Sequence, residues 1–276
     1  MTRRTAADDV LISRLERHET VVHAMPAREM LDLGDALALF DPVDRTPFWN
    51  RMVGLRWPED PAAFDRRLAA ALALFAVRDR QPHVWPPLGT RTPPDIIERL
   101  MVNGFVDMGG GHLMVLDDPS ACGPLRPGEL AADTTLTVIA TAADAGPGDL
   151  DAFAAVSTEA FGGEADRTDD LVAELRATLD DPRVVRVLIR VDGEPAAVTR
   201  TTAFDGRVYV STVAAAARFR GRGLAGLATR AALAASGGPA AGLAYLGVDS
   251  SNAAALRLYA RLGFVSVGES PDLLLR

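Results

Sequence analysis

A turn rich in glycine and arginine joins an apolar strand to a helix in the second half of the chain. It occupies residues 214–225, with the order Ala-Ala-Ala-Ala-Arg-Phe-Arg-Gly-Arg-Gly-Leu-Ala. Backbone N–H groups at a helix N-terminus, together with the positive end of the helix dipole, form an anion site. Glycine lets the backbone approach a phosphate closely, and Arg218, Arg220 and Arg222 add positive charge. The pattern therefore predicts a phosphate or diphosphate site.

Two common phosphate-binding loops do not fit this turn. The Gly-Lys-Ser/Thr ending of a nucleotide P-loop is missing. Gly221, Gly223 and Gly226 have the G-x-G-x-x-G spacing of a dinucleotide-binding fold. That fingerprint opens its domain, whereas here a long strand-rich segment with two expected helices comes first. Taken without their context, the glycines also fit a tight strand-to-helix turn that binds nothing.

This turn and a later stretch resemble the two conserved motifs of the GNAT acetyltransferase superfamily. The first motif is Arg-x-x-Gly-x-Ala at residues 220–225, after an apolar strand. The second covers residues 246–264, where a strand is followed by Asn252, then by Tyr259 seven residues later, and then by Leu-Gly-Phe. The resemblance extends over residues 134–276 and is strongest in the part that contains both motifs.

The resemblance implies a fold, an acyl donor and a set of binding residues. The fold would be α/β (α+β), with two GNAT-like domains, each a mixed, mostly antiparallel sheet flanked by helices. Acetyl-CoA would be the acyl donor, with no metal. Amides of the turn would hold the CoA pyrophosphate, and the main chain of the preceding strand would pair with the pantetheine arm. The implied CoA-binding residues are Val213, Ala215, Arg220, Gly221, Arg222, Gly223, Leu224, Ala225, Gly226 and Asn252.

Tyr259 is the candidate general acid. When an amine attacks a thioester, the departing CoA thiolate needs a proton, and a phenol with a pKa near ~10 can supply it. Tyr259 could instead be a half-buried core aromatic on an amphipathic helix. Asn252 directly precedes that helix, so it is expected as a helix N-cap, as a contact to the CoA arm by resemblance, or as both.

The general base is the missing part of the pattern. Many members of the family have glutamate five residues before the asparagine, and this chain has Gly247 there. Asp249 lies two residues further on, so it should face the same side of the strand and could replace the glutamate, directly or through a water. It could equally belong to the turn before the helix. A water relay, or Glu159 from an earlier helix, is a further alternative, although Glu159 is expected to be a solvated helix residue.

The elements that would position these residues follow from periodicity and turn signals. Asp192-Gly193 indicates a hairpin turn between two apolar runs. The expected helices are 150–161, 169–179, 224–235 and 253–262. The expected strands are 135–140, 184–191, 196–203, 207–213, 243–248, 264–267 and 273–275, and the last two should close the sheet of the second half.

The first half of the chain repeats this pattern without the cofactor chemistry. A Gly-Phe-Val run at residue 104 recurs at residue 263, an offset of 159, and the same offset superposes 64–77 on 223–236 and 50–54 on 209–213. The turn then corresponds to Pro-Ala-Ala-Phe-Asp-Arg, Tyr259 to Leu100 and Asn252 to Pro93. We expect a degenerate copy in 1–117, a Pro/Gly-rich linker in 118–133 and the catalytic domain in 134–276. An unrelated α/β first domain is the alternative.

Composition restricts the other classes of function. The formal net charge is −8, which argues against broad binding to nucleic acid or anionic membranes and suits a cationic acceptor. All 29 basic residues are arginine, so no lysine can act as a base or Schiff-base former. Cys122 is the only cysteine, and the four histidines lack metal-ligand spacing. No apolar run has the length of a signal peptide or membrane span, so a cytoplasmic protein is expected.

The expected function is acetyl-CoA-dependent N-acetylation of a primary amine on a small molecule, such as an amine, amino acid or amino-sugar-like compound. The alternatives are a regulatory protein that binds acyl-CoA without turnover, and an enzyme of the same fold that acylates oxygen or transfers a longer chain. The expected partners are CoA and the amine acceptor, and binding to nucleic acid or to a membrane is not expected. The sequence leaves open whether the chain forms a homodimer.

Overall fold

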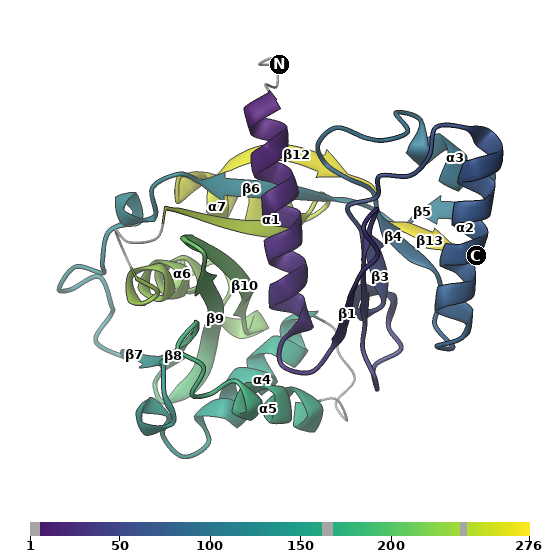
Figure 1. The fold of residues 1–276 in the computed structure, drawn as a ribbon. Helices are drawn as coiled ribbons and strands as arrows, with labels where there is room; N and C mark the ends of the chain where they lie inside the picture. Colours follow the sequence, from purple (N-terminus) through teal and green to yellow (C-terminus); the bar gives the residue numbers. More distant parts are fainter. Residues whose placement is uncertain (1–5, 162–167, 238–241) are drawn as a thin grey trace. The chain divides into compact units, whose positions relative to one another are not determined.

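The computed structural model describes residues 6–161, 168–237 and 242–276, which form two compact units (Figure 1). The first unit comprises residues 1–113, 248–253 and 266–276, and the second comprises residues 114–247 and 254–265. The first of these boundaries between the units, after residue 113, lies close to the domain boundary expected at residue 117. The two C-terminal segments of the first unit, however, were expected to belong to the catalytic domain.

The first unit is built on a six-stranded sheet in the order β1-β2-β3-β4-β13-β5. Its core contains buried side chains from the sheet and from two of the helices, such as Met52, Phe64 and Leu100. The strands are β1 Glu29–Asp32, β2 Leu37–Phe40, β3 Arg51–Val53, β4 His83–Trp85, β5 Phe105–Asp107 and β13 Leu273–Leu275, and the helices are α1 Ala6–Ala24, α2 Pro61–Ala76 and α3 Ile96–Val102. A 3-10 turn, η1 Pro47–Trp49, precedes β3.

The second sheet has seven strands in the order β12-β6-β11-β10-β9-β8-β7. Its strands are β6 Gly111–Leu116, β7 Thr134–Ile139, β8 Val184–Val191, β9 Glu194–Phe204, β10 Arg207–Ala215, β11 Leu243–Asp249 and β12 Val265–Ser270. The helices in this part of the chain are α4 Asp149–Phe161, α5 Thr168–Ala177, α6 Leu224–Ala235 and α7 Ala253–Arg261, and short 3-10 turns are η2 Pro119–Cys122, η3 Ala142–Asp144 and η5 Ala217–Phe219. The expected helices and strands are confirmed to within a few residues.

Helices cover both faces of strands β8 to β10. Arg190 on β8 binds Asp149 of α4 at 2.7 Å, and Arg186, four residues earlier, binds the carbonyl of Leu175 in α5. Successive side chains of a strand point to opposite faces, so α4 and α5 lie on the face to which Arg186 and Arg190 point. Thr201 on β9 instead contacts Ser236, directly after α6. Helix α6 therefore covers the other face.

The expected linker is tied to α6 by one arginine side chain. Arg230 of α6 donates to the carbonyls of Cys122 and Pro124, at 3.0 and 2.9 Å, and forms an ion pair with Glu129 at 3.0 Å. Residues 118–133 are therefore packed along the second unit rather than extended as a spacer. Burial raises the pKa of the Cys122 thiol, which disfavours the reactive thiolate.

The internal duplication is visible in the strand topology. In the first sheet, β3 pairs antiparallel with β2 and parallel with β4. In the second sheet, β10 pairs antiparallel with β9 and parallel with β11. The helix that follows is α2 in the first half and α6 in the second. Both halves thus have the same order of elements, as the offset of 159 residues predicted.

The two halves of the sequence exchange one strand each. Strand β13 lies between β4 and β5 in the first sheet, and β6 lies between β12 and β11 in the second. The expectation that 273–275 closes the sheet of the second half is therefore wrong. Leu273 pairs with Val84 and Asp107 and is fully buried in the first core. A short apolar strand encodes its own conformation but not the sheet that it joins.

Replacing Leu273 with alanine is expected to destabilise the protein by about 2–5 kcal/mol, because the substitution leaves a cavity in a packed core. Chemical denaturation measures the free energy of unfolding. Leu274→Ala is the matched control, since Leu274 is half-buried on the opposite face of the same strand. Equal effects of the two substitutions would contradict the position of β13 in the first core.

Candidate active site

The parallel ladder between β10 and β11 stops before either strand ends. Register pairs run from Arg207 with Leu243 to Tyr209 with Tyr245, whereas β10 continues to Ala215 and β11 to Asp249. Beyond this point β10 remains paired with β9, with a bulge between Ser211 and Ala214. Antiparallel strands direct their N–H and C=O groups alternately to the two sides. The last part of β10 thus has main-chain groups on the side away from β9, as expected for a strand that pairs with an extended ligand.

The turn after β10 combines open glycines with free backbone donors. Gly221 and Gly223 have φ of +79° and +78°, and a Cβ atom built on either would have no heavy atom within 4 Å. Gly223 is the N-cap of α6, whose first turn contains no acidic residue. Among the residues that the structure describes, the N–H groups of 221–225 have no hydrogen-bond acceptor. A series of N–H groups at a helix N-terminus is an anion-binding arrangement.

Gly226 differs from the other two glycines of the turn. Its N–H donates to the carbonyl of Gly223 at 3.0 Å. A Cβ atom there would lie 3.1 Å from the Leu258 side chain of α7. Gly226 therefore allows α6 and α7 to pack closely, and its N–H is used inside the helix.

The three arginines of the turn are not equivalent. Arg218 forms an ion pair with Glu194, and Arg222 lies 3.4 Å from Asp133. Both pairs are exposed, so their contribution to stability is small and either arginine can exchange partners. The Nε–H of Arg220 donates to the carbonyl of Ala215 at 3.2 Å. In the described part of the chain no carboxylate pairs with Arg220, so its charge is the one most available to a phosphate.

The corresponding helix of the first unit is capped by its own side chain. Asp60 accepts a hydrogen bond from the N–H of Ala63 at 2.8 Å, and Pro61 begins α2. Proline has no N–H, and a carboxylate at the cap repels a second anion. Leu100, which corresponds to Tyr259, is fully buried in the apolar core. These features support the expected loss of cofactor binding in the first copy.

Tyr259 is a buried side chain of α7. It is 6% exposed, and its ring packs against Phe264 with centroids 5.9 Å apart. Burial raises the pKa of the phenol well above its usual value, which keeps the side chain protonated at neutral pH and makes it a weaker acid than an exposed tyrosine. Within the described ranges its hydroxyl has no hydrogen-bond partner. A protonated phenol that is not engaged elsewhere can serve as a proton donor.

Asp249 and Asn252 form the turn that leads into α7. Oδ1 of Asp249 accepts from the N–H and the hydroxyl of Ser251, at 2.7 and 2.5 Å, and the N–H of Asn252 donates to the Asp249 carbonyl at 3.0 Å. Gly247 and Asp249 are both exposed, and Val248 between them is buried, which agrees with the expectation that the two share a face. One Asp249 oxygen therefore belongs to the turn, and Oδ2 is the atom left for a base.

Glu159 contacts the turn after β10. Its carboxylate accepts a hydrogen bond from the N–H of Ala217 at 2.6 Å, so this exposed residue of α4 caps the 3-10 turn η5. Glu159 is therefore more than a solvated helix residue. Its hydrogen bond helps to position the segment between β10 and α6.

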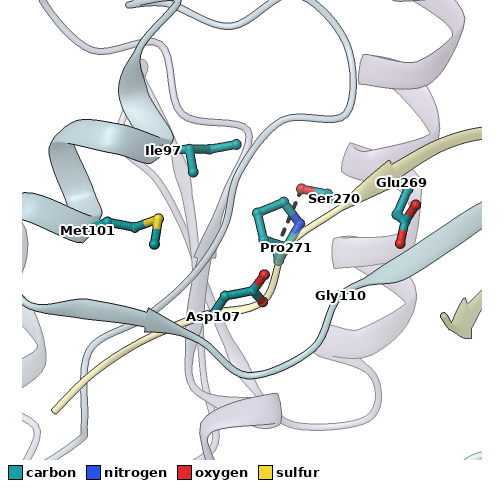
Figure 2. Close-up of a pocket in the computed structure, with 7 residues that line it drawn as sticks. All are labelled: Ile97, Met101, Asp107, Gly110, Glu269, Ser270 and Pro271. Carbon is teal, nitrogen blue, oxygen red and sulfur yellow. Dashed lines mark hydrogen bonds between the residues drawn. The ribbon is translucent and has the colours of Figure 1, made fainter. Parts of the chain in front are cut away.

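A hollow in the first unit has the wrong charge for CoA. It has a volume of about 350 Å³ and is lined by Ile97, Met101, Asp107, Gly110, Glu269, Ser270 and Pro271. Figure 2 shows Ile97 and Met101 of α3 on one side of Pro271, and Gly110 and Glu269 on the other. The only charged residues in this lining are acidic, so the hollow would repel phosphate. A Cβ on Gly110 would overlap the Ser270 backbone, 1.9 Å away, so only glycine fits there.

A comparison with protein families gives a match in the same part of the chain as the candidate site. A model of the acetyltransferase (GNAT) family matches residues 151–264. Residues 151–264 are therefore similar to the GNAT family, over a stretch that is less than half of the chain. The match includes β10, the turn, α6, β11 and α7, which are the elements that contain both motifs. Among the described residues, no helix is long and apolar enough to cross a membrane.

Solved structures show that the GNAT fold extends over both halves. A GCN5-related N-acetyltransferase from Kribbella flavida is 25% identical, with a TM-score of 0.68 and coverage of 96% of this chain and 95% of that chain. A tandem GNAT protein from the clavulanic acid biosynthesis pathway is 17% identical, with a TM-score of 0.63 and coverage of 98% and 87%. A GCN5-related N-acetyltransferase from Sphaerobacter thermophilus is 18% identical, with a TM-score of 0.58 and coverage of 98% and 93%. No curated protein matches the sequence.

Proposed function

We propose that the chain is an acetyl-CoA-dependent N-acetyltransferase that acts on a primary amine of a small molecule. The observation that supports this most is the series of N–H groups at residues 221–225 without an acceptor in the described ranges, in a turn that contains two glycines with open space at the Cβ position. A diphosphate accepts several such bonds at once, and charge-assisted hydrogen bonds are the strong ones. The cytoplasmic location expected from the sequence remains a prediction.

In the proposed binding mode, CoA follows β10 and the turn. The N–H groups of residues 221–225 hold the pyrophosphate, with Arg220 nearby, and Asn252 contacts the arm. The main chain at Val213 and Ala215 pairs with pantetheine, on the side of β10 that is not bonded to β9. In this proposed alignment the thioester would lie beside the bulge of β10, where the ladder to β11 has ended.

The proposed chemistry is direct transfer of the acetyl group. The amine nitrogen attacks the thioester carbonyl, the C–S bond breaks, and the acetyl group ends on nitrogen as an amide. Tyr259 donates its proton to the departing thiolate and recovers a proton from water. The proton lost by the amine passes to water or to Oδ2 of Asp249, because Gly247 has no group that could accept it.

Acetyl-CoA is expected to raise the melting temperature of the purified protein by roughly 5 °C or more at 100 times the dissociation constant, where binding contributes ~2.7 kcal/mol. Differential scanning fluorimetry measures this shift. Acetyl phosphate at the same concentration is the control, since it carries the acetyl group without the pantetheine or the diphosphate. No shift with acetyl-CoA would contradict the proposal.

Release of free CoA thiol in the presence of amines separates the proposed enzyme from its alternatives. A stability shift without thiol release from any amine would indicate a regulatory protein that binds acyl-CoA. Release that requires an alcohol, or a longer acyl chain, would indicate a different acyltransferase with the same fold.

A further inference from the structure

Polar and charged side chains lie together on one face of the second sheet, the face that α4 and α5 cover. Arg186 of β8 is the register partner of Arg200 of β9, which is in turn the partner of Ser211 of β10. Thr202 and Arg207 lie on the same face, because Thr202 pairs with Tyr209 and Arg207 is two residues from Tyr209. We call Arg186, Arg200, Thr202 and Arg207 the arginine face. Sequence patterns did not single it out, although charged residues inside apolar strands were an available signal.

The arginine face contains buried donors that the protein does not satisfy. Arg186 is fully buried, and its Nε and Nη1 atoms have no hydrogen-bond partner among the residues that the structure describes. The hydroxyl of Thr202, also fully buried, and the Nε of Arg207 are likewise without one in the described chain. Buried polar groups are normally bonded, so several unsatisfied donors on one face need an explanation.

No carboxylate in the described part of the second unit is bonded to Arg186. Its two hydrogen bonds, both from Nη2, go to the neutral Leu175 carbonyl and the Thr178 hydroxyl. The acidic group that acts on it electrostatically is Asp181, whose carboxylate is held by Arg183 at 2.6 and 2.9 Å. Burial, together with the charge of Arg200, lowers the pKa of Arg186 to about 10. Arg186 therefore remains a cation at neutral pH, and a buried cation of this kind is costly without an anion.

The arginine face lies in line with the proposed reaction centre. Ser211, where the bulge of β10 begins, is in register with Arg200 and Arg186 across three strands. Neighbouring strands are ~4.8 Å apart, so this row is ~10 Å long. Arg200 is half-buried. It lies on β9, directly beside Ser211 of β10, and Arg186 lies one strand further away, on β8. An acceptor with its amine near the bulge could direct an anionic group toward the arginines.

We propose that the acceptor carries a carboxylate, so that the substrate is an amino acid or a similar compound with both an amine and a carboxylate. Arg200 binds the carboxylate, and Arg186 is a positioning residue that adds charge and orients Arg200. This inference rests on the proposed acetyl transfer and narrows its substrate class. It selects the amino acid from the acceptors expected from the sequence, because the charge close to the proposed reaction centre is positive although the whole chain is acidic.

Turnover of matched acceptors tests the proposal. Thiol release is measured for the standard amino acids and for the corresponding amino acid amides, which differ only in the carboxylate. The acids are expected to have a kcat/KM about ten- to a hundredfold higher, which is the typical effect of a charged hydrogen bond. Amides that react as well as the acids would overturn the proposal.

The variant Arg186→Met distinguishes a role in binding from a role in the fold. It is expected to remove the preference for acids over amides, to leave the acetyl-CoA stability shift unchanged and not to lower the melting temperature, since an apolar side chain replaces a buried unpaired charge. Arg176→Met, which removes an exposed arginine of α5 away from this face, is expected to change none of these. An Arg186→Met protein that melts lower and keeps the preference would show a structural role and overturn the proposal.

A binding measurement tests the carboxylate site even if the proposed acetyl transfer is not observed. If acetyl-CoA binds but no amine releases thiol, the proposed function fails. Calorimetry with the CoA complex then compares N-acetyl amino acids with their amides. Tighter binding of the acids in the unmodified protein, lost in Arg186→Met, would still support the carboxylate site, and equal binding would exclude it.

Discussion

Replacing Gly223 with glutamate is expected to weaken acetyl-CoA binding by at least ~100-fold. Gly223 has a φ of +78° and begins α6, whose N-terminal N–H groups are free within the described chain. A carboxylate at this position competes for those donors and repels the diphosphate. The loss corresponds to two charge-assisted hydrogen bonds of about 1.5–3 kcal/mol each. Isothermal titration calorimetry measures the dissociation constant.

Two control variants separate charge from backbone strain. Gly223→Ala introduces only the cost of a left-handed conformation, roughly 1–2 kcal/mol, because a Cβ there meets no atom within 4 Å. Gly193→Glu places the same charge at a glycine with a φ of +79° in the hairpin between β8 and β9. Neither control should approach the loss of affinity caused by Gly223→Glu. Tight binding by Gly223→Glu would remove the support for a pyrophosphate site.

Replacing Tyr259 with phenylalanine is expected to lower kcat by about 10²–10⁴-fold, the usual contribution of general acid catalysis. The ring and its contact with Phe264 are retained, and only the hydroxyl is lost. Steady-state measurement of thiol release gives kcat and the KM for acetyl-CoA. The KM should change little, because the proton is needed only when the C–S bond breaks.

Stability provides the control for this variant. The hydroxyl of Tyr259 has no partner among the described residues, so its removal breaks no hydrogen bond and should not lower the melting temperature. The acetyl-CoA stability shift should also be unchanged. Unchanged turnover would show that Tyr259 is only a core aromatic, and a large drop in melting temperature would show that the loss of activity has a structural cause.

Much of the candidate site follows from contiguous sequence. The turn at residues 220–225 could be proposed as an anion site because glycines, a helix start and a preceding strand are neighbours along the chain. Tyr259 and Asn252 could be placed because a helix fixes their spacing. The duplication was visible as a constant offset, since both copies retain the same order of strands and helices.

Other features depend on residues that are distant in sequence. The pairing of Arg218 with Glu194 and of Arg222 with Asp133 leaves Arg220 as the arginine of the turn without a carboxylate partner in the described chain. The hydrogen bond from Ala217 to Glu159 joins residues 58 positions apart. Neither follows from composition or periodicity.

Local sequence thus determined which segments are strands, which are helices and where the proposed phosphate-binding turn lies, because backbone conformation and helix capping depend on near neighbours. Tertiary structure alone decided that β13 joins the first sheet and β6 the second, and that Arg186, Arg200 and Arg207 share one face of the second sheet. Strand pairing and register arise from the packing of whole sheets, and the sequence of a short apolar strand does not specify the strand with which it pairs. The positive charge of the proposed acceptor site is therefore a property of the assembled sheet, opposite in sign to the net charge of the chain.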